Sequence, residues 1–137
     1  MVNEQTPPVS GPDSTTPSAD DAALALTIEQ VDDVQVVHAS GRIDTSTADR
    51  FDARMQQVVA PDAARLVLDL AHVTYVSSAG LRSLLTLLKR VKALGGSLVL
   101  AAVHPRVVDI LEIAGFTPLF VLAATADEAL AQLQTPR

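Results

Sequence analysis

The stretch Leu66-Val67-Leu68-Asp69-Leu70-Ala71-His72-Val73-Thr74-Tyr75-Val76-Ser77-Ser78-Ala79-Gly80-Leu81-Arg82-Ser83-Leu84-Leu85 decides the fold, because an apolar run leads through two serines into a helical pattern. The run from Arg65 to Leu70 is short and continuous, which is typical of a strand covered on both faces. From Leu81 onward, apolar residues recur at helical spacing, at Leu84, Leu85, Leu88 and Val91. The stretch therefore predicts a buried strand, a turn containing two serines, and an amphipathic helix.

The two serines stand where this helix is expected to begin. The first four N–H groups of a helix lack intrahelical partners, and the helix dipole makes that end partly positive. A phosphate group on a serine at this position would therefore be stabilised electrostatically. A simpler role is that one serine caps the helix, an interaction typically worth about 1 kcal/mol. By the residues alone, capping is the favoured interpretation.

Patterns on both sides of this stretch predict the remaining elements. Residues 24–29 and 34–39 alternate as half-buried strands, and Asp32-Asp33 between them predicts a hairpin turn. A helix is expected over about 46–59, behind the potential caps Thr45, Ser46 and Thr47. Further expected elements are a strand at 97–103, a helix from Pro105 to Gly115, a strand at 119–122 and a helix from Thr125 to about Leu133. The predicted fold is a single α/β domain, with an opening β-hairpin, a mixed sheet of four to five strands and helices packed against it.

Composition limits the classes of function. The chain has 137 residues, of which 48% are hydrophobic, and this suits one domain with an aliphatic core. Its net charge of -6 argues against a nucleic-acid partner. The absence of cysteine excludes disulfides and thiolate metal sites, and we expect no metal and no cofactor. No apolar run is long enough to span a membrane and no signal peptide is evident, so a cytoplasmic protein is expected.

The N-terminal residues differ from the rest of the chain. Residues 1–22 are rich in Pro, Ser and Thr and contain four acidic residues without any Lys or Arg: Glu4, Asp13, Asp20 and Asp21. Such a composition cannot bury enough apolar surface to offset chain entropy. We therefore expect a flexible tail over residues 1–22 and a folded domain over residues 23–137.

Three groups of residues recur in the order and spacing of a known family. They are Gly41-Arg42-Ile43-Asp44, then Leu68-Asp69-Leu70 with Val73, Tyr75 and Val76, and then Ser77-Ser78-Ala79-Gly80-Leu81. Together they resemble the STAS domain family, which is typified by the anti-sigma factor antagonists of bacteria. The second half of the chain is also similar to the family at Gly95-Gly96-Ser97-Leu98, at Val107 to Leu111, and at Gly115-Phe116 and Phe120. The resemblance covers about residues 24–134 and so implies a STAS-like fold for the whole expected domain.

The resemblance implies a partner switch. In relatives, an anti-sigma factor that is itself a serine kinase phosphorylates a serine at the strand-to-helix turn, and a metal-dependent serine phosphatase removes the phosphate. The unphosphorylated form binds the kinase and frees the sigma factor. By position the phosphorylated serine is Ser78, and phosphorylation adds about -1.5 to -2 charge at pH 7. The implied partner-binding residues are Asp44, Ser77, Ser78, Ala79, Gly80, Arg82 and Ser83, with Arg82 and Ser83 on an exposed first turn. A monomer is favoured, with the oligomeric state left open.

Two positions depart from the family pattern, and two other functions stay open. Relatives commonly have Asp-Ser-Ser-Gly or Asp-Ser-Thr-Gly, whereas this chain has Ser77 in the acidic position and Ala79 in place of the second hydroxyl. One alternative is a non-switching STAS scaffold or accessory subunit of a signalling or transport complex. The other is a serine hydrolase, using Ser78, His72 or His104, and Asp44 or Asp69. Because the chain lacks the Gly-x-Ser-x-Gly elbow, we do not expect an enzyme. His38 is expected to be a strand residue, and the sequence shows no evident partner for it.

Overall fold

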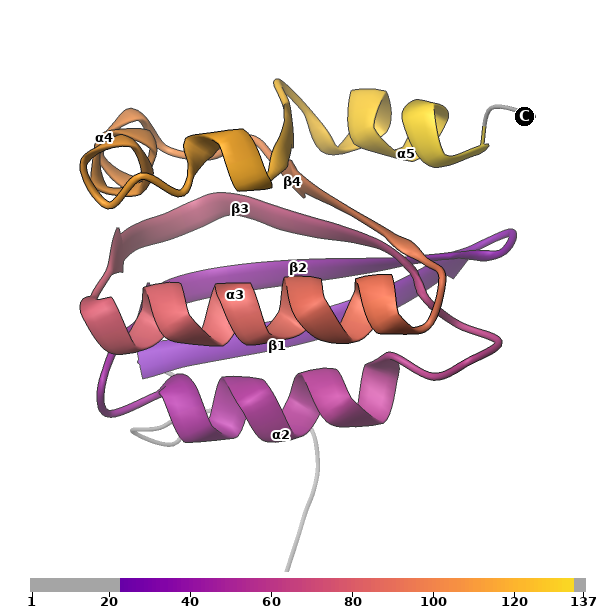
Figure 1. The fold of residues 1–137 in the computed structure, drawn as a ribbon, viewed down its shortest axis with the longest axis horizontal. Coiled ribbons are helices and arrows are strands. Elements are labelled where there is room, and N and C mark those ends of the chain that lie inside the picture. The colour runs from indigo at the N-terminus through magenta and orange to yellow at the C-terminus, as the bar shows by residue number, and fades with distance from the viewer. Residues whose placement is uncertain (1–22, 135–137) are drawn as a thin grey trace, which may run out of the picture.

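Five strands form one sheet in the computed structural model, which describes residues 23–134 (Figure 1). The strands are β1 (Leu24–Val31), β2 (Val34–Ile43), β3 (Arg65–Val76), β4 (Ser97–Ala101) and β5 (Val121–Ala123). They lie side by side in sequence order, with β1 antiparallel to β2 and the other pairs parallel. The predicted hairpin and mixed sheet are confirmed. The expected tail, residues 1–22, lies outside the described residues.

In the described part of the chain, four helices and one 3-10 turn are connected to these strands. They are α2 (Ala48–Val58), α3 (Ser78–Ala93), α4 (Pro105–Ile113), η2 (Thr117–Leu119) and α5 (Ala126–Gln134). Figure 1 shows α2 and α3 on one side of the sheet and α5 on the other. Within residues 23–134, no helix is long and apolar enough to cross a membrane.

Each face of the sheet has its own core. Leu66, Leu68 and Leu70 of β3 pack in the larger cluster with Phe51 of α2 and Leu84 of α3. The opposite face of the same strand contributes Val67 to a smaller cluster, which includes residues of α5. Side chains alternate between the faces of a strand, so a strand buried on both faces must be apolar at successive positions. The prediction of a central strand from the apolar run is therefore confirmed.

Both strands that lead to the serine turn are longer than expected. β2 continues to Ile43 and β3 to Val76, where the sequence patterns had been interpreted as ending near residues 39 and 70. The pairing of these strands has irregularities between His38 and Ser40 and between Gly41 and Arg42. Such irregularities disturb the two-residue period. In β3 the buried positions after Leu70 are accordingly three residues apart, at Val73 and Val76, and a search for strict alternation misses them.

The predicted strand at 119–122 is displaced. Residues 117–119 form η2, with Pro118 near its start, and β5 begins only at Val121, which pairs with Val99. Proline has a fixed φ and no N–H to donate, so it suits the first turn of a helix and not a ladder. The fifth strand is therefore real but three residues long.

Candidate functional site

Ser77 joins β3 to α3, and its backbone groups and its hydroxyl are all hydrogen-bonded within the domain. Its backbone N–H donates to the Ile43 carbonyl at 3.0 Å, and its own carbonyl accepts from the N–H of Leu81 at 2.8 Å. Its hydroxyl accepts a bond from the backbone N–H of Gly80 at 3.2 Å, which makes Ser77 the N-cap of α3. A side-chain oxygen that accepts from the third helical N–H is the usual arrangement of a serine cap. The capping role expected for one of the serines therefore belongs to Ser77.

Ser78 is the first residue of α3 and is exposed. Its hydroxyl makes no hydrogen bond to any residue between 23 and 134, and the backbone N–H groups of Ser78 and Ala79 also have no acceptor there. Helix N-termini leave such donors free, and they point out along the helix axis. The turn therefore presents one unengaged hydroxyl beside two unengaged amides.

Gly80 holds this turn against the end of β2. A Cβ atom on Gly80 would lie 2.1 Å from the carbonyl oxygen of Ile43 and 2.8 Å from Cγ1 of Val76. Only a residue without a side chain permits so close an approach. Gly80 is buried, and its close contact with Ile43 fixes the position of the start of α3.

Asp44 follows β2 and organises the loop to α2. Its Oδ1 accepts from the backbone N–H of Ser46 at 3.0 Å and from the Ser46 hydroxyl at 2.7 Å, and its Oδ2 accepts from Nε of Arg42 at 3.1 Å. The Ser46 hydroxyl bond and the Arg42 bond hold the pKa of the Asp44 carboxyl at about 2, below its ordinary 3.8. Asp44 is thus an ionised turn residue that fixes the loop.

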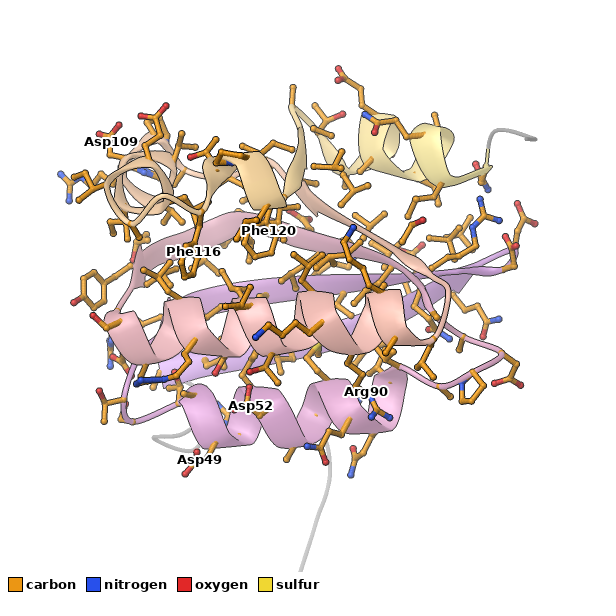
Figure 2. The ribbon with its side chains drawn as sticks, viewed as in Figure 1. Asp49, Asp52, Arg90, Asp109, Phe116 and Phe120 are labelled. Atoms are coloured by element: carbon orange, nitrogen blue, oxygen red, sulfur yellow. The ribbon has the colours of Figure 1, made fainter. Side chains whose placement is uncertain are left out.

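A groove between α2 and α3 starts at the serine turn. Its first part has a volume of about 300 Å³, and its lining residues are Thr45, Ala48, Asp49, Asp52, Ala79, Arg82, Ser83 and Thr86. A second part of about 170 Å³ shares Asp52, Ser83 and Thr86 and continues toward Arg90. Figure 2 shows Asp49, Asp52 and Arg90 on these two helices. The groove extends from Thr45, in the loop after Asp44, to Ala79 beside the serine turn.

The two predicted residues of the second turn of α3 differ in exposure. Arg82 is exposed, whereas Ser83 is 97% buried, at a relative exposure of 3%. Position 83 faces α2, so the expectation that Ser83 lies on an exposed turn is wrong. The sequence analysis missed Asp49 and Asp52, which form the α2 wall. Their spacing of three residues on one helix face was the available signal.

The histidines do not assemble a serine-hydrolase site. His38 Nδ1 lies 2.7 Å from Oδ2 of Asp69, and His38 Nε2 lies 3.2 Å from Oε1 of Glu29. The bond to Asp69 raises the pKa of His38 above its ordinary 6.5, against the opposing effect of partial burial. His38, for which the sequence showed no evident partner, is therefore a strand residue with two carboxylate partners. Asp69 is engaged by this histidine and not by His72 or His104.

His104 has a structural role as well, because its Nδ1 accepts from the backbone N–H of Arg106 and caps α4. No histidine of residues 23–134 hydrogen-bonds Ser78. Over the same residues, no group of three His, Cys, Asp or Glu side chains is placed to hold a metal ion. In the described part of the chain, the Ser78 hydroxyl therefore has no histidine bonded to it.

Comparison with known proteins gives one consistent result. Residues 25–129 match the model of the STAS domain family. The chain is 32% identical over 112 residues to BtrV of Bordetella bronchiseptica, a candidate anti-sigma factor antagonist, and the match covers 82% of this chain and 97% of BtrV.

Solved structures agree with this match. An anti-sigma factor antagonist from Mycobacterium paratuberculosis is 29% identical with a TM-score of 0.72, covering 86% of this chain and 98% of the other. The phosphorylated form of SpoIIAA from Bacillus has a TM-score of 0.65 at 19% identity, covering 80% of this chain and 100% of SpoIIAA, and this likeness shows a shared fold.

Proposed function

The chain belongs to the STAS domain family, and on that premise we propose that it is an anti-sigma factor antagonist switched by phosphorylation of Ser78. Its partner is an anti-sigma factor that is also a serine kinase. The unphosphorylated chain binds this kinase in the cytoplasm and releases a sigma factor. A metal-dependent serine phosphatase resets the phosphorylated form. The chain itself performs no catalysis and binds neither nucleic acid nor membrane.

The division of roles between the two serines carries the proposal. The Ser77 hydroxyl is occupied as a helix cap, whereas the Ser78 hydroxyl is exposed and unengaged by the described chain. A kinase must reach the oxygen of the serine hydroxyl and take up the proton that this hydroxyl loses. An exposed hydroxyl without a hydrogen bond is therefore the better acceptor. This difference supports Ser78 over its neighbour despite the serine at the usual acidic position.

The surroundings of Ser78 suit a phosphate without loss of the fold. The free amides of Ser78 and Ala79 lie at the positive end of α3, and Arg82 is exposed four residues along the same helix face. The added negative charge is therefore tolerated by the domain. A partner docked over the groove, whose α2 wall carries Asp49 and Asp52, meets a surface more negative than before. Phosphorylation then weakens the interface and leaves the domain folded.

A non-switching STAS scaffold is the second candidate function. The residue at position 77 favours this candidate, because this chain has Ser77 where relatives commonly have an aspartate before the phosphorylated serine. In that case the surface formed by the Asp44 loop, the serine turn and Arg82 binds a partner permanently.

The test uses the kinase that copurifies with the protein from its own cells, together with labelled ATP. We expect wild type and Ser77→Ala to be labelled and Ser78→Ala to stay unlabelled. Ser77→Ala is the matched control, because it loses a hydroxyl one position away while the proposed acceptor remains. Labelling of Ser78→Ala would refute the assigned site. A partner that binds all three proteins and labels none of them would support the scaffold.

A further inference from the structure

The solvent face of α3 carries an unpaired row of cations. The helix contains Arg82, Lys89, Arg90 and Lys92 and no acidic residue. Arg90 donates to the Val59 carbonyl at 3.1 Å, whereas Arg82, Lys89 and Lys92 make no ion pair with any residue from 23 to 134. We call these three residues the α3 basic face. Arg82 and Lys89 are seven residues apart, so they lie on one side of the helix, and Lys92 lies one turn beyond Lys89.

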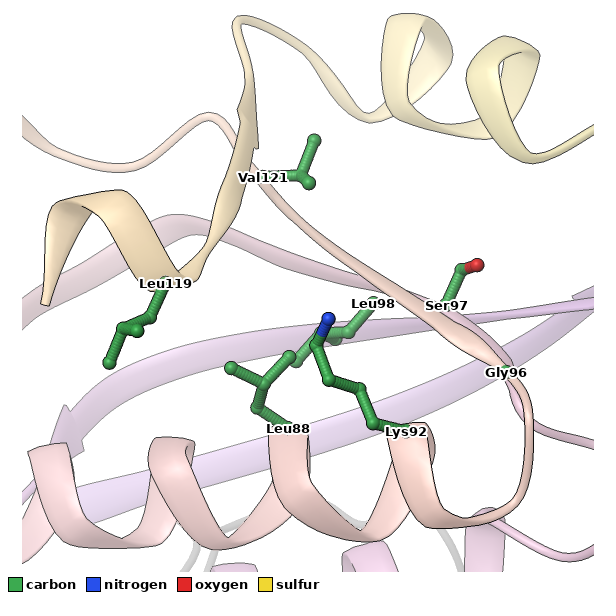
Figure 3. A pocket seen from close by; sticks show the side chains of 7 residues that line it. All are labelled: Leu88, Lys92, Gly96, Ser97, Leu98, Leu119 and Val121. Atoms are coloured by element: carbon green, nitrogen blue, oxygen red, sulfur yellow. The ribbon is translucent and has the colours of Figure 1, made fainter.

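The ends of this face differ in their surroundings. Near Arg82, the opposite wall of the groove carries Asp49 and Asp52, which repel a second acidic group. Near Lys92, a hollow of about 110 Å³ is lined by no acidic residue at all. Figure 3 shows the Lys92 side chain extending from α3 into the space before β4, with Leu119 and Val121 nearby. An acidic segment is thus favoured most strongly at Lys89 and Lys92.

The chain supplies such a segment. Residues 1–22 contain Glu4, Asp13, Asp20 and Asp21 without any Lys or Arg, and so contribute -4 of the net charge of -6. The segment enters the fold at the serine-turn end of the sheet, because Leu24 pairs with Gly41, two residues before Ile43. Extended residues 13–24 span at most about 35–40 Å, whereas the 16 residues of α3 rise by about 24 Å. Asp13 can therefore reach the Lys89 and Lys92 end of the basic face, whereas Asp20 and Asp21, which are at most about 10–14 Å of chain from Leu24, reach only toward its Arg82 end.

We propose that the acidic N-terminal segment of this chain docks on the α3 basic face and competes with the partner protein there. Tethering makes the contact intramolecular, so weak ionic attraction acts at a high effective concentration. The occupied face includes Arg82 and adjoins the turn that holds Ser78. Binding of the kinase then requires displacement of the segment. This consequence rests on the proposed function, whereas the docking itself does not.

The test places one spin label on the full-length chain. Because the chain contains no cysteine, Ser14→Cys gives a single attachment site beside Asp13. We expect the label to broaden the amide signals of Lys89–Lys92 most strongly at about 0.05 M salt, and to lose this effect near 1 M salt, where charges are screened within about 3 Å. Lys89→Gln with Lys92→Gln should abolish the selective broadening. Neutralising the four acids, as Glu4→Gln, Asp13→Asn, Asp20→Asn and Asp21→Asn, should do the same.

Two controls make the result decisive. Arg54→Gln with Arg106→Gln removes two exposed cations on α2 and α4, and it should leave the broadening unchanged. Broadening that is uniform over the domain, or that persists in the lysine variant, overturns the proposal. Broadening in unlabelled chains mixed with spin-labelled chains would show docking between copies, and it would also overturn it. None of these measurements uses the kinase, so they stand apart from the proposed switch.

Discussion

Gly80→Ala is expected to destabilise the domain, although a glycine-to-alanine change within a helix ordinarily has the opposite effect. Gly80 is the third residue of α3, and alanine there would by helix propensity alone stabilise the fold by up to about 0.5–1 kcal/mol. The new Cβ, however, would lie 2.1 Å from the Ile43 oxygen and 2.9 Å from the Ile43 carbonyl carbon. Both atoms belong to the backbone of a paired strand, so they cannot move aside as a side chain would. The start of α3 must shift instead.

The magnitude follows from these opposing effects. Overpacking of this kind costs typically about 1–3 kcal/mol and occasionally more. After the propensity gain is subtracted, we expect a net loss of roughly 0.5–2 kcal/mol in the free energy of unfolding. With a urea slope of about 2 kcal/mol per molar for a small domain, the unfolding midpoint falls by roughly 0.25–1 M. Helical circular dichroism against urea concentration measures this shift.

A control in the same turn separates the contact from propensity. Ala79→Gly changes the adjacent helical residue in the opposite sense and should cost at most about 1 kcal/mol. Amide hydrogen exchange gives the local readout, because the Ser77 N–H bonds the same Ile43 carbonyl and should exchange faster in Gly80→Ala. If Gly80→Ala were as stable as wild type or more so, the close approach of α3 to β2 would be wrong.

Three further predictions concern the site and its surroundings. Ser77→Ala should lower the free energy of unfolding by about 1 kcal/mol, because the helix cap is lost. Ser78→Ala should change it by less than about 0.5 kcal/mol in the same urea titration. Equal losses in the two variants would contradict the assignment of the cap to Ser77 alone. The pKa of His38 is raised above 6.5 by its carboxylate partners, so its stabilising contribution is fully present below that pH and is lost as pH rises through the higher folded value. The urea midpoint should therefore fall more for wild type than for His38→Gln between about pH 5.5 and about pH 8.5, and identical profiles would refute this. The pKa of Asp44 is lowered to about 2, so its contribution to folding stability is present above its ordinary pKa of 3.8 and is lost as pH falls through about 2. Titration of the Asp44 carboxyl by NMR checks this value. A titration midpoint near 3.8 would contradict the hydrogen bonds assigned to Asp44.

Local patterns predicted the parts of the fold that obey a single period. The apolar run of β3 and the stripe of α3 each follow one spacing, and the hairpin turn has its own residue types, so these elements could be located from the sequence. The ends of β2 and β3 could not. Register irregularities along this pair change the spacing of buried residues, and they depend on pairing between segments some thirty residues apart.

The sequence predicted where the site lies in the fold, but it did not predict how the side chains of the site are arranged. The resemblance placed Ser78 at the turn, and helix-end electrostatics explained why a phosphate would be tolerated there. Which serine caps depends on backbone dihedral angles at Ser77, which no residue pattern encodes. The groove depends on the packing of α2 against α3, so the burial of Ser83 and the acidic wall of Asp49 and Asp52 emerged only in three dimensions.

The most direct test of the switch measures kinase affinity before and after phosphorylation of the same protein. Wild type is phosphorylated by the copurifying kinase, the phosphate is located by mass spectrometry, and binding of the kinase to both forms is measured by calorimetry. We predict phosphate on Ser78 and an affinity at least about tenfold weaker, equivalent to about 1.4 kcal/mol. Phosphate on Ser77, or equal affinity of the two forms, would contradict the account.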